Sequence, residues 1–352
     1  MEIRENIPLA PLTTFGIGGP ARWFAEATSE AEVTEGCDWA RTRGVPLFVL
    51  GGGSNLLVSD AGFGGLVLHV ALKGIEQDGD LFRAAAGEPW EHCVKRATEG
   101  GYAGIECLAG IPGTVGGTPV QNVGAYGQEV SSVIERVRVF DARAREFDEL
   151  SAEECGFGYR RSRFNTADRG RFIVTRVDYR LRRGGPPNLA YADLRNYFQN
   201  RAKPVSLVEV ADAVRAIRRS KGMLIVEGDP DCRSAGSFFK NPAVTEGVAD
   251  RIRALAQSSG APLRVYPGEH GLVKIPAAWL IEQAGFKKGY VRGAAGISSR
   301  HTLGLVNRGN ARGDAHGGAT AEEILALARE IAGAVEAKFG VRLEMEPEKV
   351  GF

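Results

Sequence analysis

The chain contains, at residues 46–57, the stretch Pro46-Leu47-Phe48-Val49-Leu50-Gly51-Gly52-Gly53-Ser54-Asn55-Leu56-Leu57. Its first half is apolar, with β-branched and aromatic residues, which predicts a short strand that ends at the glycines. Because glycine has no Cβ, successive N–H groups there can point into one hollow, as they do around bound phosphate. Ser54 and Asn55 add side-chain donors. No Gly-Lys-Ser/Thr follows, which excludes a nucleoside-triphosphate loop, while a plain glycine-rich turn stays an alternative.

A second glycine-rich region covers residues 108–127. It reads Leu108-Ala109-Gly110-Ile111-Pro112-Gly113-Thr114-Val115-Gly116-Gly117 and then Asn122-Val123-Gly124-Ala125-Tyr126-Gly127. Separate backbone hollows near residues 52 and 115 can flank both ends of a pyrophosphate. The two regions together therefore predict a dinucleotide cofactor rather than a lone phosphate.

A third glycine pattern, Gly16-Ile17-Gly18-Gly19-Pro20-Ala21, fits the loose dinucleotide fingerprint but lacks its context. That fingerprint needs a strand before it and a helix that begins within it. Residues 5–14 contain two prolines and little apolar alternation, and residues 21–27 predict a strand instead of a helix. These neighbours exclude a Rossmann domain at this place.

A polar turn carries two adjacent aromatic rings at residues 233–242, which read Arg233-Ser234-Ala235-Gly236-Ser237-Phe238-Phe239-Lys240-Asn241-Pro242. Polar groups beside large apolar rings are disfavoured unless each finds a partner. Ser237, Lys240 and Asn241 therefore predict either contact with a ligand or a tight network with the backbone, and the residues alone leave both open.

Composition limits the classes of protein that this chain can be. Its 352 residues, 43% of them hydrophobic, predict a large core and two or three domains. A net charge of +1, from 44 basic and 43 acidic residues, gives no reason to expect nucleic acid or an anionic membrane as partner. No apolar run approaches the roughly 18 residues that span a bilayer, and the N-terminus lacks a secretory hydrophobic region, so we expect a cytoplasmic protein.

The cysteines and histidines predict neither disulfides nor a metal site. The five cysteines are scattered and contain no Cys-x-x-Cys pair, which favours free thiols in a reducing compartment. The five histidines show no ligand spacing relative to them.

Helix and strand signals organise the rest of the chain. Three capping boxes predict helix starts at Ser29, Ser206 and Thr320. Another helix fits residues 88–98. Strands are expected over 66–70, 81–86, 133–141, 172–181 and 341–346. Residues 182–187 read as a linker and 188–200 as an aperiodic functional loop, and the Gly-rich insert at 308–318 reads as a surface loop.

The ordered motifs resemble the UDP-N-acetylenolpyruvoylglucosamine reductase family, flavin enzymes of bacterial peptidoglycan precursor synthesis. The resemblance runs nearly end to end. Besides the glycine regions and the polar turn, it rests on Thr14-Phe15-Gly16-Ile17, Phe157-Gly158-Tyr159-Arg160, Ala278-Trp279-Leu280-Ile281-Glu282-Gln283 and Glu346-Pro347-Glu348. Tyr191 in the aperiodic loop places the chain with members that fold a tyrosine-bearing loop over the substrate.

The resemblance implies an α+β fold: the two-subdomain FAD-binding architecture of the vanillyl-alcohol-oxidase type with a third, α+β substrate-binding domain. We expect FAD-binding subdomains at 1–68 and 69–204, with the substrate loop near 186–200. A substrate-binding domain at 205–340 and a C-terminal strand at 341–352 would complete the chain.

The resemblance also implies FAD as a non-covalent cofactor and NADPH as reductant. Related oxidases tether flavin through His or Cys, whereas the first glycine loop offers Ser54. The implied FAD contacts are Gly51, Gly52, Gly53, Ser54, Asn55, Leu56, Ile111, Pro112, Gly113, Thr114, Gly116, Gly117, Asn122 and Gly124.

The family reduces an enolpyruvyl ether to a lactyl ether, and three residues match its catalytic positions. Ser237 matches the proton donor to the enolate carbon, with Lys240 or water as possible support. Arg160 and Glu348 match the pair that polarises the substrate carboxylate, where a glutamate fits only if it carries a proton or is offset by Arg160. Substrate recognition carries over to Tyr126, Tyr191, Lys221, Asn241 and Gln283.

Two other functions stay open at this point. A flavin oxidase of alcohols or sugars would react with oxygen and consume no NADPH. A UDP-sugar-binding protein without catalysis would be colourless when purified. The resemblance implies UDP-N-acetylglucosamine enolpyruvate as the small-molecule substrate, and we expect a monomeric protein.

Overall fold

The computed structural model describes residues 1–309 and 318–352, which form two compact units. Unit 1 comprises residues 1–8, 20–53 and 63–220, and unit 2 comprises residues 9–19, 54–62 and 221–352. The chain therefore passes between the units several times. The finer four-part division expected from the sequence stays a prediction.

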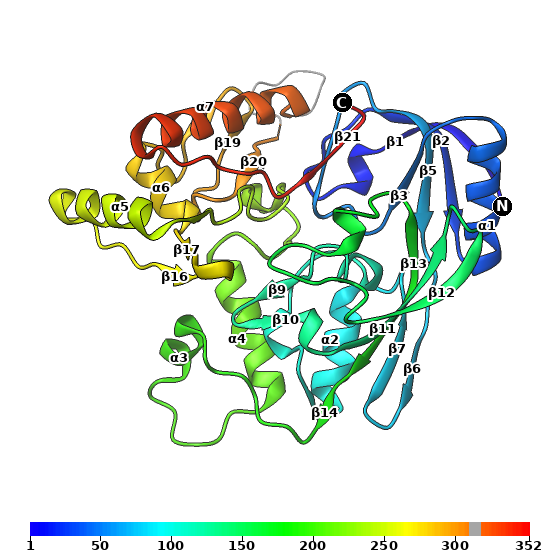
Figure 1. Ribbon diagram of the computed structural model, residues 1–352, viewed down its shortest axis with the longest axis horizontal. Coiled ribbons are helices and arrows are strands. Elements are labelled where there is room, and N and C mark those ends of the chain that lie inside the picture. The colour runs from blue at the N-terminus through cyan, green and yellow to red at the C-terminus, as the bar shows by residue number, and fades with distance from the viewer. Residues whose placement is uncertain (310–317) are drawn as a thin grey trace. The chain divides into compact units, whose positions relative to one another are not determined.

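The first sheet of unit 1 is made from the N-terminal segments (Figure 1). Its order is β1-β2-β5-β3, with β2 and β3 both parallel to β5. The strands are β1 (Arg4–Pro8), β2 (Pro20–Ala27), β3 (Leu47–Leu50) and β5 (Phe63–Val70). Helix α1 (Glu30–Thr42) packs Val33 and Ala40 into the core of this unit. The glycine loop follows β3, as the sequence predicts.

The second sheet of unit 1 has the order β12-β11-β13-β7-β6 and is antiparallel. Its strands are β6 (Ile75–Asp78), β7 (Leu81–Ala85), β11 (Ile134–Asp141), β12 (Glu146–Ser151) and β13 (Phe172–Arg180). Helices α2 (Trp90–Glu99) and α4 (Leu207–Ser220) contribute Trp90 and Val214 to the same core, and α3 spans Ala192–Phe198. Short pairs join β8 (Tyr102–Ala103) to β14 (Arg182–Arg183) and β9 (Gly124–Ala125) to β10 (Gln128–Glu129).

Unit 2 has its own core, built around Phe15, Phe238 and α7 (Ala321–Phe339). Its other helices are α5 (Glu246–Ser259) and α6 (Ala277–Gln283). One small sheet has the order β15 (Ala243–Val244), β17 (Val273–Lys274) and β16 (Tyr266–Pro267). A second has the order β18 (Val291–Arg292), β19 (Ala295–Ile297) and β20 (Leu305–Asn307). The last strand, β21 (Glu348–Val350), runs parallel to β4 (Leu56–Val58).

Most predicted elements are confirmed, and helix capping explains several of them. The boxes at Ser206 and Thr320 are complete. Each cap hydroxyl accepts from the N–H of the glutamate three residues on, and the carboxylates of Glu209 and Glu323 accept from the cap N–H groups. At Ser29 only half of the box forms, because Glu32 accepts from Thr28 instead. No described helix is long and apolar enough to cross a membrane.

Two expectations about secondary structure are wrong. Residues 341–346 form no regular strand, because only Met345 pairs, in an isolated bridge with Phe239, and the strand that closes the chain begins at Glu348, where β4 offers a backbone partner. The loop expected at 188–200 contains α3, whose Leu194 is buried. Most of the Gly-rich insert, residues 310–317, lies outside the described residues.

Candidate active site

The two glycine regions of unit 1 meet. A Cβ on Gly52 would lie only 2.5 Å from the Gly113 Cα and 3.0 Å from the Thr114 nitrogen. A Cβ on Gly51 would lie 3.0 Å from the Thr114 hydroxyl oxygen. Because real side chains do not tolerate a 2.5 Å approach to backbone, glycine at position 52 is what lets the two loops touch.

The touching loops leave hydrogen-bonding groups available for a ligand. Gly53 and Gly113 have positive φ angles of 62° and 120°. Among the described residues, no partner is found for the backbone N–H groups of Gly52, Gly53, Gly113 and Thr114. The hydroxyl of Thr114 is buried and also lacks a partner in this part of the chain. Donors brought close together from two segments in this way fit the pyrophosphate of a dinucleotide.

The end of the first loop belongs to unit 2 and is tied to the C-terminal segment there. Asn55 donates from Nδ2 to the Glu346 carbonyl at 3.2 Å, and its own carbonyl accepts from the Glu348 N–H at 2.9 Å. Leu56 begins β4, and the Ser54 carbonyl accepts from the Thr14 hydroxyl at 3.3 Å. The predicted FAD contacts at 54–56 thus stabilise the segment that carries Glu348.

The rest of the second glycine region forms a tight turn in unit 1. Ile111 and Pro112 are partly exposed, as is Gly116, while Gly117 is exposed. Asn122 is 1% exposed, and its amide is used within the protein: Nδ2 donates to Glu129 and the Gly158 carbonyl, and Oδ1 accepts from the Ser131 N–H.

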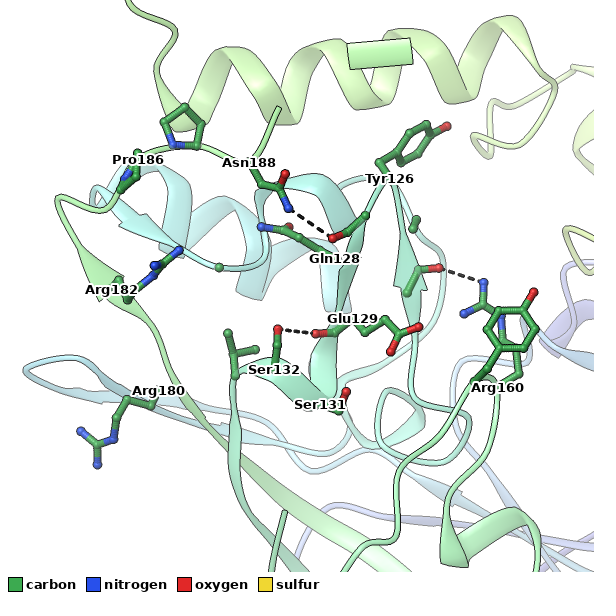
Figure 2. A pocket seen from close by; sticks show the side chains of 17 residues that line it. Tyr126, Gln128, Glu129, Ser131, Ser132, Arg160, Arg180, Arg182, Pro186 and Asn188 are labelled. Carbon is green, nitrogen blue, oxygen red and sulfur yellow. Dashed lines mark hydrogen bonds between the residues drawn. The ribbon is translucent and has the colours of Figure 1, made fainter. Parts of the chain in front are cut away.

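Arg160 lies in a hollow of about 1050 Å³ in unit 1, together with Tyr126, Gln128, Glu129 and Asn188 (Figure 2). Its guanidinium donates to the Gly124 carbonyl at 2.9 Å. Arg160 and Tyr126 both have left-handed backbone, with φ angles of 53° and 48°. Such conformations are strained for residues with a Cβ and cluster at functional sites.

The ring of Tyr126 packs against the ring of Tyr191, with centroids 5.3 Å apart and planes at 83°. Tyr191 precedes α3, and 38% of its surface is exposed. Unit 1 therefore brings Arg160 and both predicted substrate tyrosines to one region.

In unit 2, Ser237 lies in an extended segment bonded on both sides. Residues 237 and 239 form bridges to Gly304 and Met345, respectively. The Glu346 N–H donates to the Phe238 carbonyl at 2.9 Å. Continuing this antiparallel register puts Ser237 opposite residue 347, one position before Glu348. Two predicted catalytic residues thus come from neighbouring segments of this unit.

The rings of Phe238 and Phe239 anchor that segment in the core of unit 2. They are 0% and 2% exposed, and their centroids lie 5.2 Å apart. Lys240, expected as possible support for Ser237, forms an ion pair with Glu344. The structure therefore gives Lys240 a partner on the neighbouring segment.

The remaining predicted substrate residues of unit 2 lie around α6 and at the end of α4. Asn241 accepts, through Oδ1, from the Ala277 N–H at 2.9 Å, at the first residue of α6. Gln283 is the last residue of that helix. Lys221 follows α4, and its charge acts on His301, whose pKa is lowered to about 4 by burial and then by Lys221 and Lys288.

Sequence reasoning missed His301 and the buried Glu106. Glu106 stands between Ile105 and Cys107 in an apolar run, and a carboxylate in such a run is itself a signal, because charged groups are rarely buried without partners. No comparable signal surrounds His301.

Comparisons with known proteins match both units. Residues 21–147 match the FAD binding domain family, and residues 229–350 match the C-terminal domain of UDP-N-acetylenolpyruvoylglucosamine reductase. The chain is 46% identical to the UDP-N-acetylenolpyruvoylglucosamine reductase of Streptomyces coelicolor over 353 residues, with 99% of this chain and 90% of that protein covered. The corresponding protein of Thermobifida fusca is 44% identical over 99% of this chain and 98% of its own length.

A solved structure agrees. The crystal structure of UDP-N-acetylenolpyruvylglucosamine reductase from Thermus caldophilus is 28% identical, with a TM-score of 0.67 and coverage of 99% of this chain and 100% of that one. The matches confirm the α+β flavin-binding fold with a further domain, and FAD as the cofactor that the glycine loops fit.

Proposed function

Because the chain belongs to the UDP-N-acetylenolpyruvoylglucosamine reductase family, we propose that Arg160, Ser237 and Glu348 carry the proton and charge chemistry of its reaction. The enzyme reduces UDP-N-acetylglucosamine enolpyruvate to UDP-N-acetylmuramate in peptidoglycan precursor synthesis, with FAD and NADPH. The roles of individual residues are argued below from their surroundings.

FAD would be held by the N–H groups of Gly52, Gly53, Gly113 and Thr114, with the Thr114 hydroxyl as an additional donor. When bound and reduced by NADPH, FAD supplies the hydride. The contact between the two glycine loops supports this assignment, because donors from separate segments converge there.

Ser237 would deliver the proton to the substrate carbon next to the carboxylate. Backbone pairing on both sides fixes the main chain at Ser237, so only the side chain can change its conformation. The Ser237 hydroxyl makes no hydrogen bond to any residue that the structure describes, so its proton is not used by the described part of the chain. A positioned proton donor contributes roughly 10² to 10⁴ in rate.

Arg160 and Glu348 would form the pair that holds the substrate carboxylate, with the guanidinium of Arg160 supplying the positive charge that stabilises the negative charge developing there. Arg160 offers a permanent, planar set of donors, suited to a carboxylate oxygen pair. Preorganised groups of this kind lower the barrier because their interaction strengthens as negative charge builds up in the transition state. The strained backbone of Arg160 and the strand that holds Glu348 both support fixed placement.

Tyr126, Tyr191, Lys221, Asn241 and Gln283 would bind the UDP-sugar. Cations and hydroxyls suit its diphosphate, and aromatic or amide groups suit its uracil. We also propose that the enzyme is a cytoplasmic monomer without nucleic-acid or membrane partners, in keeping with its balanced charge.

The observation that supports this proposal most is the strand register, by which Ser237 lies opposite the residue before Glu348. The test measures the two half-reactions separately: reduction of the flavin by NADPH and its reoxidation by the substrate. We expect Ser237→Ala to keep flavin reduction by NADPH while slowing reoxidation by the enolpyruvyl substrate by roughly 10² to 10⁴. Ser234→Ala, in the same turn, serves as the control and should reoxidise at the parent rate. Equal reoxidation of the Ser237→Ala variant and the parent would refute the role.

A further inference from the structure

The buried carboxylate of Glu106 has no part in the proposed chemistry, yet it joins separate segments of unit 1. Glu106 is 1% exposed and lies in the turn after β8. Its Oε2 accepts from the Gly104 N–H at 2.7 Å. Its Oε1 accepts from Gln128 Nε2 and from the Asn188 N–H, each at 2.9 Å. A buried carboxylate needs such donors, and here they fix segments near residues 104, 128 and 188 relative to one another.

The two side chains around Glu106 extend this network. Asn188 donates from Nδ2 to the Gly127 carbonyl at 3.2 Å and accepts, through Oδ1, from the Ala190 N–H at 2.9 Å. Gln128 accepts, through Oε1, from the Cys107 N–H at 2.8 Å. Figure 2 shows Gln128 and Asn188 side by side, with the bond from Asn188 to the turn.

The network reaches the backbone on both sides of the tyrosine pair. Gly127 follows Tyr126, and Ala190 precedes Tyr191. Tyr126 has a positive φ angle of 48°, a conformation that is strained for a residue with a Cβ and persists only when its surroundings hold it. The bonds of Asn188 therefore hold both tyrosines at their backbones.

We propose that Glu106 is a positioning residue. Through Gln128 and Asn188 it fixes the turn at residues 126–127, here called the Tyr126 turn, and residues 188–190, the base of the loop that carries Tyr191. The inference rests on the proposed substrate contacts of these two tyrosines. A site whose competent arrangement is only partly populated binds with an apparent affinity lowered by that fraction. Loosening the network should therefore raise KM, whereas the proton and charge chemistry, carried by other residues, stays intact.

The test uses two variants and a matched control in the FAD-loaded enzyme. Glu106→Gln keeps the size of the side chain but turns one of its two acceptor oxygens into a donor, so at least one of the three N–H groups bonded to it loses its acceptor. Asn188→Ala removes both side-chain bonds at a partly buried position that does not threaten the core. The control is Asp141→Asn, a change at a buried carboxylate, 4% exposed, that is bonded to Arg171 and is remote in sequence from the loop.

We expect KM for the enolpyruvyl substrate to rise about tenfold in Glu106→Gln and Asn188→Ala, with kcat and FAD content near the parent values. Trypsin should also cleave faster at the exposed Arg195 in both variants, because the base of the loop is released. Asp141→Asn should lower thermal stability and leave KM unchanged.

Tyr191→Ala separates the failure of this inference from the failure of the proposed function. An unchanged KM in Asn188→Ala and Glu106→Gln, beside a raised KM in Tyr191→Ala, would overturn the positioning role alone. An unchanged KM in Tyr191→Ala would remove the proposed substrate contact and this inference with it. A KM raised equally by Asp141→Asn would show a general loss of stability and overturn the positioning role.

Discussion

In unit 1 several candidate residues lie on turns with left-handed backbone, whereas in unit 2 the two candidate catalytic residues lie on extended segments with bonded neighbours. Arg160, Tyr126 and Gly53 all have positive φ angles. Ser237 and Glu348 instead belong to a bridged segment and to β21. The glycine loops of unit 1 therefore offer mainly backbone N–H groups to a ligand, whereas Ser237 and Glu348 of unit 2 offer side chains.

This difference predicts different responses to substitution. A backbone site depends on the absence of a Cβ, so small additions should damage it. A side chain on a paired strand can be replaced without loss of the strand, because the pairing uses only backbone atoms. Changes in the glycine loops of unit 1 should therefore lower cofactor affinity, and changes at Ser237 or Glu348 in unit 2 should lower the rate.

After Ser237→Ala, the largest effect is expected at Glu348. Glu348→Gln leaves the bonds between β21 and β4 in place and removes the carboxyl group, so reoxidation by the substrate should slow by roughly 10² to 10³. Stopped-flow measurement of the two half-reactions checks this. Lys349→Gln, at the next and exposed position, is the control. A loss of FAD in Glu348→Gln would contradict the assignment of FAD binding to the glycine loops and of catalysis to Glu348.

A smaller effect is expected at Gly52. Gly52→Ala places a Cβ 2.5 Å from the Gly113 Cα, and relieving that overlap must move one loop. Overpacking costs about 1 to 3 kcal/mol, which predicts a dissociation constant for FAD raised roughly 10- to 100-fold. Titration of the apoprotein with FAD measures it. Gly64→Ala in β5, where a Cβ would meet nothing within 4 Å, should bind FAD like the parent.

The smallest effect concerns pH and unit 2. Burial, then Lys221 and Lys288, lowers the pKa of His301 from 6.5 to about 4. As the pH falls from about 6.5 to about 4, the unfolded chain binds a proton that the folded protein does not. The free energy of unfolding should therefore decrease over this range, by about 2 kcal/mol, and His301→Gln should remove that decrease. Denaturant unfolding at several pH values measures it, and equal slopes in both proteins would contradict it.

Much of the fold could be predicted because its signals are local. The caps at Ser206 and Thr320, and the apolar stripe of α7, depend on residues three or four positions apart. The strand expected at 341–346 was wrong because β21 exists through its pairing with β4, almost 300 residues earlier. When a distant partner sets the position of a strand, the neighbouring residues in the sequence do not indicate it.

The candidate site divides in the same way. Glycines 51–53 and 113 were predicted from their density, yet the contact between the two loops could only come from the structure. The roles of Arg160 and Glu348 came from family resemblance, since an arginine among arginines and a glutamate near a chain end carry no local signal. The loop before α3 looked aperiodic because its order comes from Asn188 and the distant Glu106.

The pairing of β21 with β4 has a consequence for dissecting the protein. A truncated gene that starts at residue 221 would still encode Ser237 and Glu348, but it would omit the strand beside which Glu348 is aligned. It would also omit residues 9–19, which supply Phe15 to the same core. Swapping C-terminal halves between relatives would therefore produce mismatched chimaeras, unless two short N-terminal inserts were exchanged along with them.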